Sequence, residues 1–353
     1  MASYALWNNK GGVGKSYLTF QIACEYAITH PDQNILVLDL CPQANSSIMF
    51  LGGMDGGEAH LDEIARTAPK RTISGYIEDR LRSPFVSPKT GATYLTQPNS
   101  INKYIPKNVF LVAGDEELEI QSSRVSNATR PGPPDAWRVA HAWIADLISD
   151  VKYSWNGTAS TVFVDCNPSF TIYTELALSA SDRLIIPFSA DGSSKRAVRA
   201  VLALLYGINR NPGGQRSEFS INSQTYRMTV PEIYCYVGNR LTQANSSSAK
   251  AFRSVVTAIG DEIWNVWRNQ PSLFCIHPTG MGAPSGRRDF KNMFQFEIND
   301  ANTASVVSGA LGIPMSKLTA GDKLMPDGRK CHVNDSQLQR QQPNLRSFVA
   351  TIE

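Results

Sequence analysis

Residues 9–16 read NKGGVGKS, a glycine-rich segment that ends in a lysine and a serine. The segment follows a short β-prone run, Tyr4–Trp7, and precedes a stretch with helical character, Tyr17–Thr29. Backbone N–H groups can surround a phosphate only where side chains do not obstruct them, and the dipole of a following helix adds positive charge. The pattern therefore predicts a strand, a phosphate-binding loop and a helix. The glycines that supply the open backbone are Gly11, Gly12 and Gly14.

The end of this segment matches the general phosphate loop, G-x-x-x-x-G-K-[ST]. In that pattern the lysine reaches the β- and γ-phosphates and the hydroxyl binds Mg²⁺, roles that fall here to Lys15 and Ser16. Asn9 stands where the general pattern has glycine, and an additional lysine, Lys10, lies just inside the loop. The alternative is a glycine-rich turn with a solvated lysine, which the strand before it and the helix after it disfavour.

Further apolar runs, of the kind expected for parallel strands buried on both faces, alternate with helical patterns. This alternation predicts an α/β fold with a mostly parallel twisted sheet and helices on both faces. We expect a single domain over residues 1–353, with an irregular insertion at about 52–107 and a C-terminal appendage at about 295–353. The predicted strands are Asn34–Leu40, Val109–Val112, Thr161–Asp165, Leu184–Pro187 and Ile233–Val237, and the predicted helices are 137–151, 171–181, 193–208 and 246–260.

The composition restricts the class of protein. With 42% hydrophobic and 18% charged residues in 353, the chain is expected to fold, which excludes a disordered or collagen-like polymer. It has no run of about 18 apolar residues and no basic stretch leading into an apolar one near its start, so we expect a cytoplasmic protein. The six cysteines form no C-x-x-C pair, which leaves buried thiols as the simplest interpretation.

Four segments together resemble the ParA/MinD family of P-loop ATPases. Residues 9–16 resemble the deviant Walker A motif of that family, and residues 39–45, DLCPQAN, resemble its D-x-D-P-Q-x-N switch motif. Residues 162–169, VFVDCNPS, resemble its Walker B segment, and residues 237–240, VGNR, resemble a strand end whose asparagine lies at the adenine. The resemblance covers about 1–50 and 109–260 well, 295–353 weakly and 52–107 hardly at all.

The resemblance implies an Mg²⁺-ATP-binding protein that forms a sandwich dimer around two nucleotides. Lys10 would then cross the interface to the partner's ATP, whereas in the simpler interpretation it only attracts ATP as a second cation. Asp191 would lie near the nucleotide and the dimer face. The implied ATP-binding residues are Gly11, Gly12, Val13, Gly14, Lys15, Ser16, Tyr17, Asn239 and Arg240; the implied metal-binding residues are Ser16, Asp39 and Asp165; the implied catalytic residues are Lys10, Lys15, Asp39 and Cys41.

Cys41 occupies the position of the second switch aspartate, which the family uses to position the attacking water. A thiol with a pKa near 8.5 carries little charge at pH 7 and accepts hydrogen bonds weakly. We therefore expect an ATPase with slow turnover. Two alternatives are normal turnover with the water held by Asp39 or backbone groups, and a redox-sensitive site built from Cys41 and Cys166.

Basic residues gather in one part of the chain. Residues 183–291 contain 14 Lys and Arg against 6 Asp and Glu, whereas the whole chain has a net charge of only +3. Such a region is typical of proteins that bind the phosphate backbone of DNA without reading its sequence. The alternative is a set of cations scattered over several solvated faces. The candidate DNA-binding residues are Lys195, Arg196, Arg199, Lys250 and Arg253.

Together these features favour a ParA-like ATPase that binds non-specific DNA as an ATP-bound homodimer and positions a plasmid, chromosome region or other cargo. A ParB-like adaptor would stimulate it, and it would associate with the nucleoid. Residues 345–353 lack the basic amphipathic character of a membrane-targeting helix, so no membrane partner is expected. The alternatives are an ATP-dependent dimer or filament switch that acts on a protein partner without DNA, and an ATP-dependent small-molecule ligase.

Overall fold

The computed structural model is built around a seven-stranded sheet in which every neighbouring pair of strands is parallel. The strand order is β3-β2-β4-β1-β5-β6-β7, which confirms the predicted α/β class. The strands are β1 (Ser3–Leu6), β2 (Asn34–Leu40), β3 (Val109–Val112), β4 (Ser160–Cys166), β5 (Arg183–Phe188), β6 (Glu232–Leu241) and β7 (Gln295–Asn299). The structure describes the backbone of residues 2–130, 133–209, 213–241, 247–300 and 302–353. It describes the side chains of the same residues except 240, 241 and 247–252.

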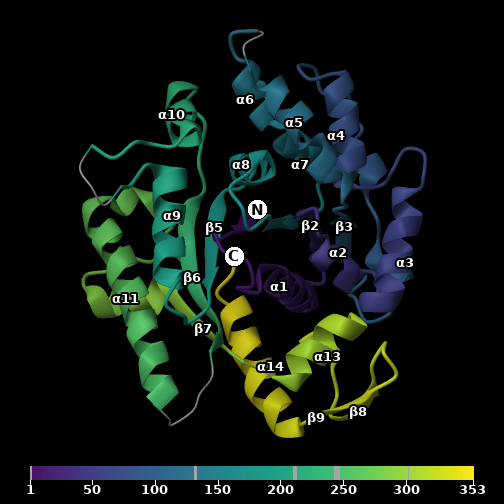
Figure 1. Ribbon diagram of the computed structural model, residues 1–353, viewed down its shortest axis with the longest axis vertical. Helices are drawn as coiled ribbons and strands as arrows, with labels where there is room; N and C mark the ends of the chain where they lie inside the picture. The colour runs from purple at the N-terminus through teal and green to yellow at the C-terminus, as the bar shows by residue number, and fades with distance from the viewer. Residues whose placement is uncertain (1, 131–132, 210–212, 242–246, 301) are drawn as a thin grey trace.

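Helices cover both faces of this sheet (Figure 1). Strand β2 shows how the two faces are filled: Leu36 and Leu38 belong to one buried apolar cluster, and Ile35 and Val37 belong to the other. Successive side chains of a strand point to opposite faces, so a continuous apolar run is what a strand covered on both sides requires. One cluster contains residues of α4, α7, α8, α9 and α11, and the other contains residues of α1, α2, α13 and α14.

The helices predicted at 171–181 and 193–208 match observed helices to within about two residues at each end, whereas the one predicted at 246–260 continues to Asn269, and the helix at Glu218–Thr225 was not predicted. The predicted helix at 137–151 is divided into two, which meet at Ala142. The helices are α1 (Lys15–Thr29), α2 (Asn45–Phe50), α3 (Met54–Ala65), α4 (Ile73–Arg82), α5 (Glu117–Ala128), α6 (Ala136–His141), α7 (Trp143–Ser154), α8 (Ile172–Ser179), α9 (Ser194–Tyr206), α10 (Glu218–Thr225), α11 (Ser247–Asn269), α12 (Arg287–Phe294), α13 (Thr303–Leu311) and α14 (Asp335–Val349). No helix among the described residues is long and apolar enough to cross a membrane.

The segment 52–107 is more regular than the sequence predicts. It contains α3 and α4, and α4 buries Ile73, Tyr76 and Ile77 completely in the core. The prolines of this segment lie outside α3 and α4, but Gly56, Gly57 and Gly75 lie inside them, so the glycine content conceals the two helices. The segment is therefore a part of the core and not only a surface elaboration.

The C-terminal segment 295–353 is also integrated into the fold. Its first strand, β7, is the seventh strand of the sheet, and α14 packs against both α1 and β7. The side chain of Gln21 on α1 donates to Ser308 Oγ at 2.8 Å and accepts from the Met315 backbone N–H at 2.7 Å. The antiparallel hairpin of β8 (Gly321–Leu324) and β9 (Lys330–Val333) projects from this segment (Figure 1).

Candidate nucleotide-binding site

The glycine-rich loop joins the carboxyl end of β1 to the amino end of α1, as the sequence predicts. Gly12 and Gly14 have φ angles of +75° and +79°, a region that residues with a Cβ atom rarely adopt. Among the described residues, none accepts a hydrogen bond from the backbone N–H groups of residues 11–14. The loop therefore presents free donors and the positive end of a helix at the same edge of the sheet, which is the arrangement that binds phosphate.

Lys15 is only 6% exposed, and its ammonium group turns back onto the loop. Its Nζ donates to the Lys10 carbonyl oxygen at 2.8 Å and to the Asn8 carbonyl oxygen at 3.3 Å. Burial lowers the pKa of Lys15, although the nearby carboxyl of Asp165 opposes that shift. A cation held this way is already shielded from most of the surrounding water before it meets a phosphate.

Asp165, at the end of β4, is fully buried, and neither of its carboxylate oxygens has a hydrogen-bond partner among the described residues. Burial, followed by the charge of Asp39, raises its pKa to about 7. A buried carboxylate without a partner is costly unless a cation compensates it. Mg²⁺ prefers oxygen ligands, so Asp165 and Ser16 fit the predicted metal site.

Asp39 is also fully buried, but its carboxylate is already hydrogen-bonded by the protein. It accepts from the backbone N–H groups of Cys41 and Ser47, at 3.1 and 3.0 Å, and from Ser47 Oγ at 2.7 Å. These bonds fix the beginning of α2 against the end of β2. Asp39 therefore has fewer free acceptor positions than Asp165. A metal role for Asp39 remains a prediction.

Cys41 lies beside both aspartates and is 4% exposed. Burial, and then the charges of Asp39 and Asp165, raise the pKa of its thiol to about 12. The side chain is therefore neutral at pH 7 and cannot replace a carboxylate electrostatically. Burial also raises the pKa of Cys166, so the environment gives neither thiol the thiolate character on which a redox-sensitive pair depends.

Asn239 on β6 lies against the loop, where its Nδ2 donates to the Val13 carbonyl oxygen at 2.9 Å. This hydrogen bond attaches the loop to β6. The contact of Asn239 with adenine remains a prediction. The side chain of Tyr17, predicted to bind ATP, is buried and turns toward Gly309 of α13, which leaves its backbone as the part nearest the loop. The side chain of Arg240 lies outside the described residues.

Lys10 does not point to Lys15 or to the loop glycines. Its Nζ forms an ion pair with Asp191 and hydrogen bonds with Ser189 Oγ at 3.2 Å and Ser194 Oγ at 3.3 Å. Ser189 and Asp191 lie in the connection between β5 and α9, and Ser194 is the first residue of α9. Partial burial would raise the pKa of Asp191, but hydrogen bonds, first among them that from Lys10, keep this pKa well below its usual range. The ammonium groups of the two loop lysines therefore have different partners.

Several residues of the site lie outside the sequence motifs. Asn8 is buried and donates from Nδ2 to the Pro187 carbonyl oxygen at 2.7 Å, and its own Oδ1 has no partner among the described residues. Ser46 and Ser47 follow the switch motif directly, and their position at the start of a helix is the one signal in the sequence that could have indicated them. The residues missed are Asn8, Ser46, Ser47, Ser189 and Ser194.

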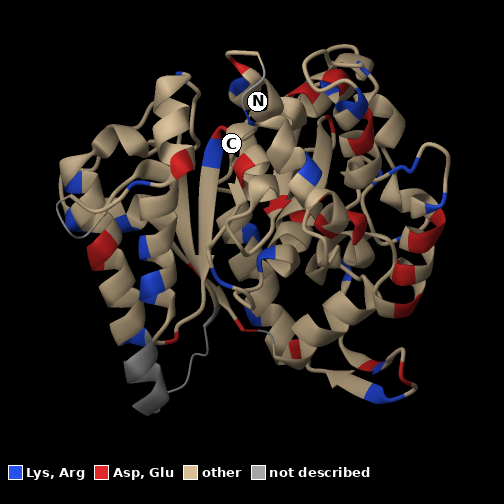
Figure 2. Ribbon diagram, turned by 45° about the horizontal axis from the view of Figure 1, so that its top comes forward, with Lys and Arg blue, Asp and Glu red and all other residues tan. Residues whose placement is uncertain are grey.

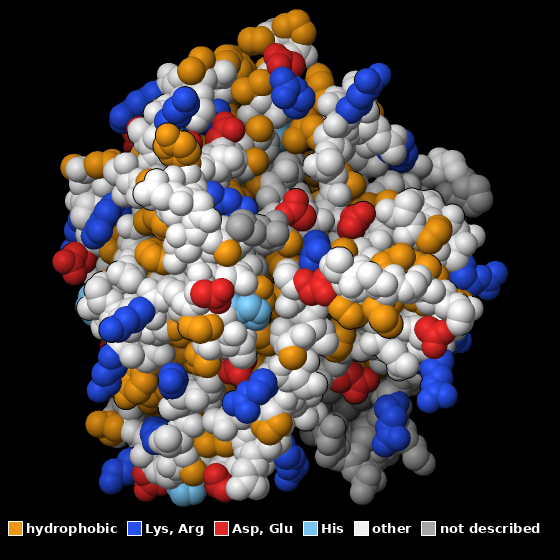
Figure 3. Space-filling model, turned by 180° about the vertical axis from the view of Figure 1, so that it is seen from behind, with side chains coloured by type: hydrophobic (Ala, Val, Ile, Leu, Met, Phe, Trp, Pro, Cys, Tyr) orange, Lys and Arg blue, Asp and Glu red, His pale blue; other side chains and the backbone are white. Residues whose placement is uncertain are grey.

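The candidate DNA-binding residues lie on α9 and α11, which carry several basic positions along their length (Figure 2). Lys195 and Arg199 share one acidic partner, Glu262, at 3.7 and 2.7 Å. Arg196 and Arg253 are exposed and form no ion pair with any described residue. On the face of the molecule seen from behind, cations are dispersed among acidic side chains (Figure 3). The side chain of Lys250 lies outside the described residues.

Asp165→Asn should stabilise the nucleotide-free protein. The folded pKa of about 7 lies above the unfolded value of about 3.9, so ionising this carboxyl costs stability that grows from about pH 4 and is complete above about pH 7. Asparagine has no charge to bury. The expected gain is on the order of 2–4 kcal/mol at pH 8 and less at pH 5, because each pKa unit corresponds to about 1.4 kcal/mol.

Thermal unfolding at pH 5 and pH 8 measures this difference, which should appear as a Tm increase of a few degrees at pH 8. Added Mg²⁺-ATP should raise the Tm of the wild-type protein more than that of the variant, because a ligand stabilises the state that binds it. An equal Tm difference at both pH values would show that the charge of Asp165 is not the cause.

Comparisons with known proteins give the family and the fold of this chain. Residues 1–212 match the model of a protein family described as AAA domain (AAA_31). Two curated relatives from Pseudomonas putida, named "Uncharacterized protein" and "Uncharacterized protein in gidB 3'region", are each 26% identical over 196 residues, which cover 53% of this chain and 56% of the relative. The chain thus spans little more than half the length of these relatives.

Two solved structures share the fold over nearly the whole chain. A single-residue variant of Cyanothece McdA in complex with ATP has a TM-score of 0.57 at 14% identity, covering 98% of this chain and 96% of McdA. The structure of pNOB8 ParA has a TM-score of 0.53 at 15% identity, covering 99% of this chain and 95% of ParA. At these identities the similarity shows the fold, and the site must be argued from its own residues.

Proposed function

Because this chain belongs to the AAA domain family of ParA/MinD-like P-loop ATPases, we propose that it is an ATP-gated dimer that binds non-specific DNA and positions or segregates cargo. The cargo is a plasmid, a chromosome region or another large assembly, and a ParB-like adaptor stimulates nucleotide turnover. The protein acts in the cytoplasm, on the nucleoid. The McdA neighbour was solved with ATP, which supports a nucleotide ligand for the shared fold.

The observation that carries this proposal is that the ammonium groups of the two loop lysines have different partners. Lys15 is buried within the loop, whereas the side chain of Lys10 is 23% exposed and bound to Asp191 on a different connection. An exposed ion pair contributes little stability. Because such a pair holds Lys10 outside its own phosphate loop, the ammonium group is free to move to a second nucleotide. Only a dimer with two facing sites supplies that nucleotide.

Light scattering tests the dimer. The purified protein should have the mass of a monomer without nucleotide or with ADP, and twice that mass with Mg²⁺ and a non-hydrolysable ATP analogue. A monomer under all three conditions, with analogue binding shown separately, would contradict the proposal.

Within each site, the chain's residues divide the work of binding and hydrolysis. The free N–H groups of residues 11–14 and the Lys15 ammonium would bind the phosphates, and Asp165 with Ser16 would hold the metal ion. A bound Mg²⁺ neutralises charge that develops on the phosphate oxygens. Asp39 positions α2 through Ser47, so the segment that follows the switch motif is attached to the end of β2.

Turnover is proposed to be slow because the neutral Cys41 thiol cannot polarise the attacking water. Cys41→Asp should raise the steady-state rate of phosphate release, and a tenfold increase is a modest expectation since general-base assistance contributes about 10²–10⁴-fold. Cys41→Ser is the matched control, because it removes the thiol without adding charge and should stay slow. If Cys41→Asp folds, binds ATP and releases phosphate no faster than wild type, Cys41 does not limit hydrolysis.

DNA binding is proposed for α9 and α11, where Arg196 and Arg253 are exposed without ionic partners among the described residues. The double variant Arg196→Ala and Arg253→Ala should bind DNA more weakly in the ATP state. The slope of the logarithm of its DNA affinity against the logarithm of the salt concentration should be less steep by about 0.9 for each DNA phosphate that the protein no longer neutralises. The matched control removes two other exposed cations, Lys107 and Lys330, and should leave retention on a DNA column unchanged.

One observation favours a second function, an ATP-dependent switch that acts on a protein partner without DNA. Glu262 neutralises part of the charge of Lys195 and Arg199, which leaves fewer free cations on α9 than the sequence suggests. An ATP dimer that is not retained on DNA would favour this alternative.

A further inference from the structure

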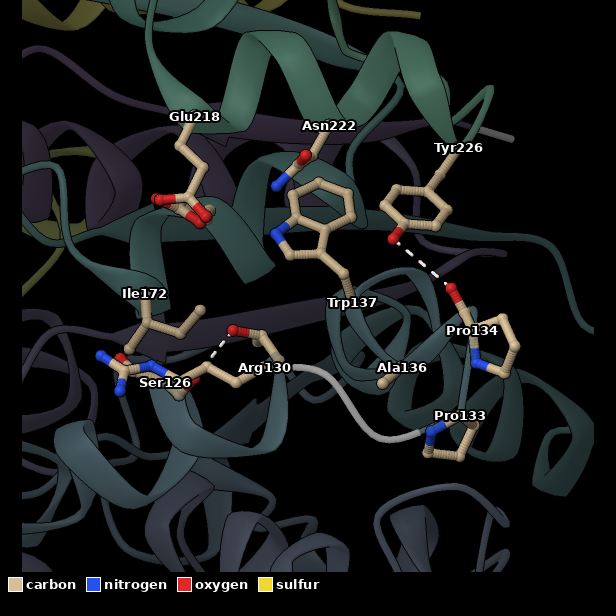
Figure 4. Close-up of a pocket in the computed structure, with 12 residues that line it drawn as sticks. Ser126, Arg130, Pro133, Pro134, Ala136, Trp137, Ile172, Glu218, Asn222 and Tyr226 are labelled. Carbon is tan, nitrogen blue, oxygen red and sulfur yellow. Dashed lines mark hydrogen bonds between the residues drawn. The ribbon is translucent and has the colours of Figure 1, made fainter.

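A cavity of about 450 Å³ lies away from the phosphate loop, between the end of α5, α6, α8 and α10 (Figure 4). This volume falls within the range of pockets that hold small ligands or a single side chain with its backbone. The proposed function uses none of the side chains that form its walls. The wall residues that could recognise a ligand are Arg130, Trp137, Ile172, Glu218, Asn222 and Tyr226.

Trp137 provides an unused hydrogen-bond donor to this cavity. The residue is 6% exposed, and its indole Nε1 has no hydrogen-bond partner among the described residues. In Figure 4 the indole nitrogen points into the cavity, toward the side on which Glu218 lies. A tryptophan N–H can only donate, so a ligand that hydrogen-bonds to this open position must carry an acceptor such as an oxygen.

The ring of Trp137 is held firmly enough to preorganise that donor. His141 stacks on it with 3.7 Å between ring centroids, and Tyr226 lies nearly parallel to it at 5.6 Å. His141 is itself fixed by hydrogen bonds to the Trp137 carbonyl oxygen and to Glu175 Oε2, at 2.8 and 3.0 Å. The donor therefore needs little ordering when a ligand binds.

Charged groups of both signs also face the cavity without partners. Glu218 and Arg130 line it, and neither side chain makes an ion pair or hydrogen bond with a described residue. Figure 4 shows Glu218 above Ile172 and the Arg130 side chain near Ser126 below it. The wall thus has a carboxylate that can bind a cation, and a guanidinium that, with the Trp137 N–H, can bind an oxygen acceptor.

We infer that this cavity binds a basic amino-acid unit, an arginine or lysine that presents its cation to Glu218 and an oxygen to Trp137 Nε1 and Arg130. The aliphatic part of such a side chain would contact Ile172 and the Tyr226 ring, and a cation near an aromatic face gains further attraction. The unit is either a free amino acid or a residue of a partner's peptide, because both carry the same two groups.

The test follows the six tryptophan indole N–H signals of the full chain by NMR, with Trp137→Phe identifying the signal of Trp137. The titrants are L-arginine, N-acetyl-arginine amide and agmatine, which keeps the cation but lacks the acceptor oxygen. We expect saturable movement of the Trp137 signal with at least one of the first two titrants. Glu218→Gln should weaken that binding about tenfold or more, because bonds to charged groups contribute about 1.5–3 kcal/mol.

The matched control is Glu58→Gln, which neutralises an exposed glutamate on α3 and should leave the affinity unchanged. Binding of free arginine alone would support a small ligand, and binding of the amide alone would support a peptide. The inference is overturned if agmatine binds as tightly as the others, if Glu218→Gln binds as well as wild type, or if no titrant moves the Trp137 signal at millimolar concentration.

Discussion

Lys15→Ala should reduce the affinity for ATP by at least about 30-fold. Lys15 is the buried cation of the phosphate loop, and the carbonyl oxygens that now hold it would be exchanged for phosphate oxygens when ATP binds. Removing one member of a buried charge pair costs about 2–5 kcal/mol, which corresponds to roughly 30-fold to several thousand-fold in affinity. Titration of a fluorescent ATP analogue measures this decrease in affinity.

The fold of this variant should remain intact. Burial lowers the pKa of Lys15, so the charge is a cost to the nucleotide-free protein and its removal should not destabilise it. Thermal unfolding provides the check, and Lys107→Ala, which removes an exposed lysine, is the matched control for binding. Affinity within a fewfold of wild type in a folded Lys15→Ala protein would exclude the phosphate role of this lysine.

Lys10→Ala should leave ATP binding nearly unchanged but abolish ATP-dependent dimerisation. Lys10 contacts Asp191, Ser189 and Ser194 instead of its own loop, so its removal takes little from the site in the same subunit. In the dimer the same ammonium would meet the partner's phosphates, where a charge-assisted hydrogen bond is much stronger. Light scattering with a non-hydrolysable analogue measures the mass.

Asp191→Asn separates this role from a purely structural one. Both variants break the ion pair between Lys10 and Asp191, but only Lys10→Ala removes the cation. If Lys10 acts on the partner's nucleotide, Asp191→Asn should dimerise at least as readily as wild type, because Lys10 no longer has a competing carboxylate. Equal impairment of dimerisation in both variants would mean that the ion pair only stabilises the connection between β5 and α9.

The phosphate loop and the central strands could be predicted from the sequence because their signals are local. A glycine cluster between a strand and a helix, and apolar runs such as Asn34–Leu40, specify their structure within a few neighbouring residues. The helices of 52–107 were not predicted because the apolar residues of α4 are interrupted by polar ones. The burial of α4 depends on the sheet and on α7, which are far away in the sequence.

Partners within the site could not be predicted for the same reason. The motifs place Asp39 and Asp165 at the ends of two strands, and the structure shows that these strands, β2 and β4, are neighbours with the two residues in register. Which carboxylate remains unpaired depends on Ser47, whose position follows from how α2 packs. Likewise the contacts of Lys10 with Asp191, and of Asn239 with the Val13 carbonyl, join residues about 180 and 226 positions apart.

The most direct test of the proposed function is retention of the purified protein on non-specific double-stranded DNA with ATP, with ADP and without nucleotide, over a series of salt concentrations. We expect retention only with ATP, and a steep decrease as salt rises, because neutralised phosphates release counterions. Absence of retention under conditions where the ATP dimer is shown to form would contradict the proposed function, as would equal retention in all three nucleotide states.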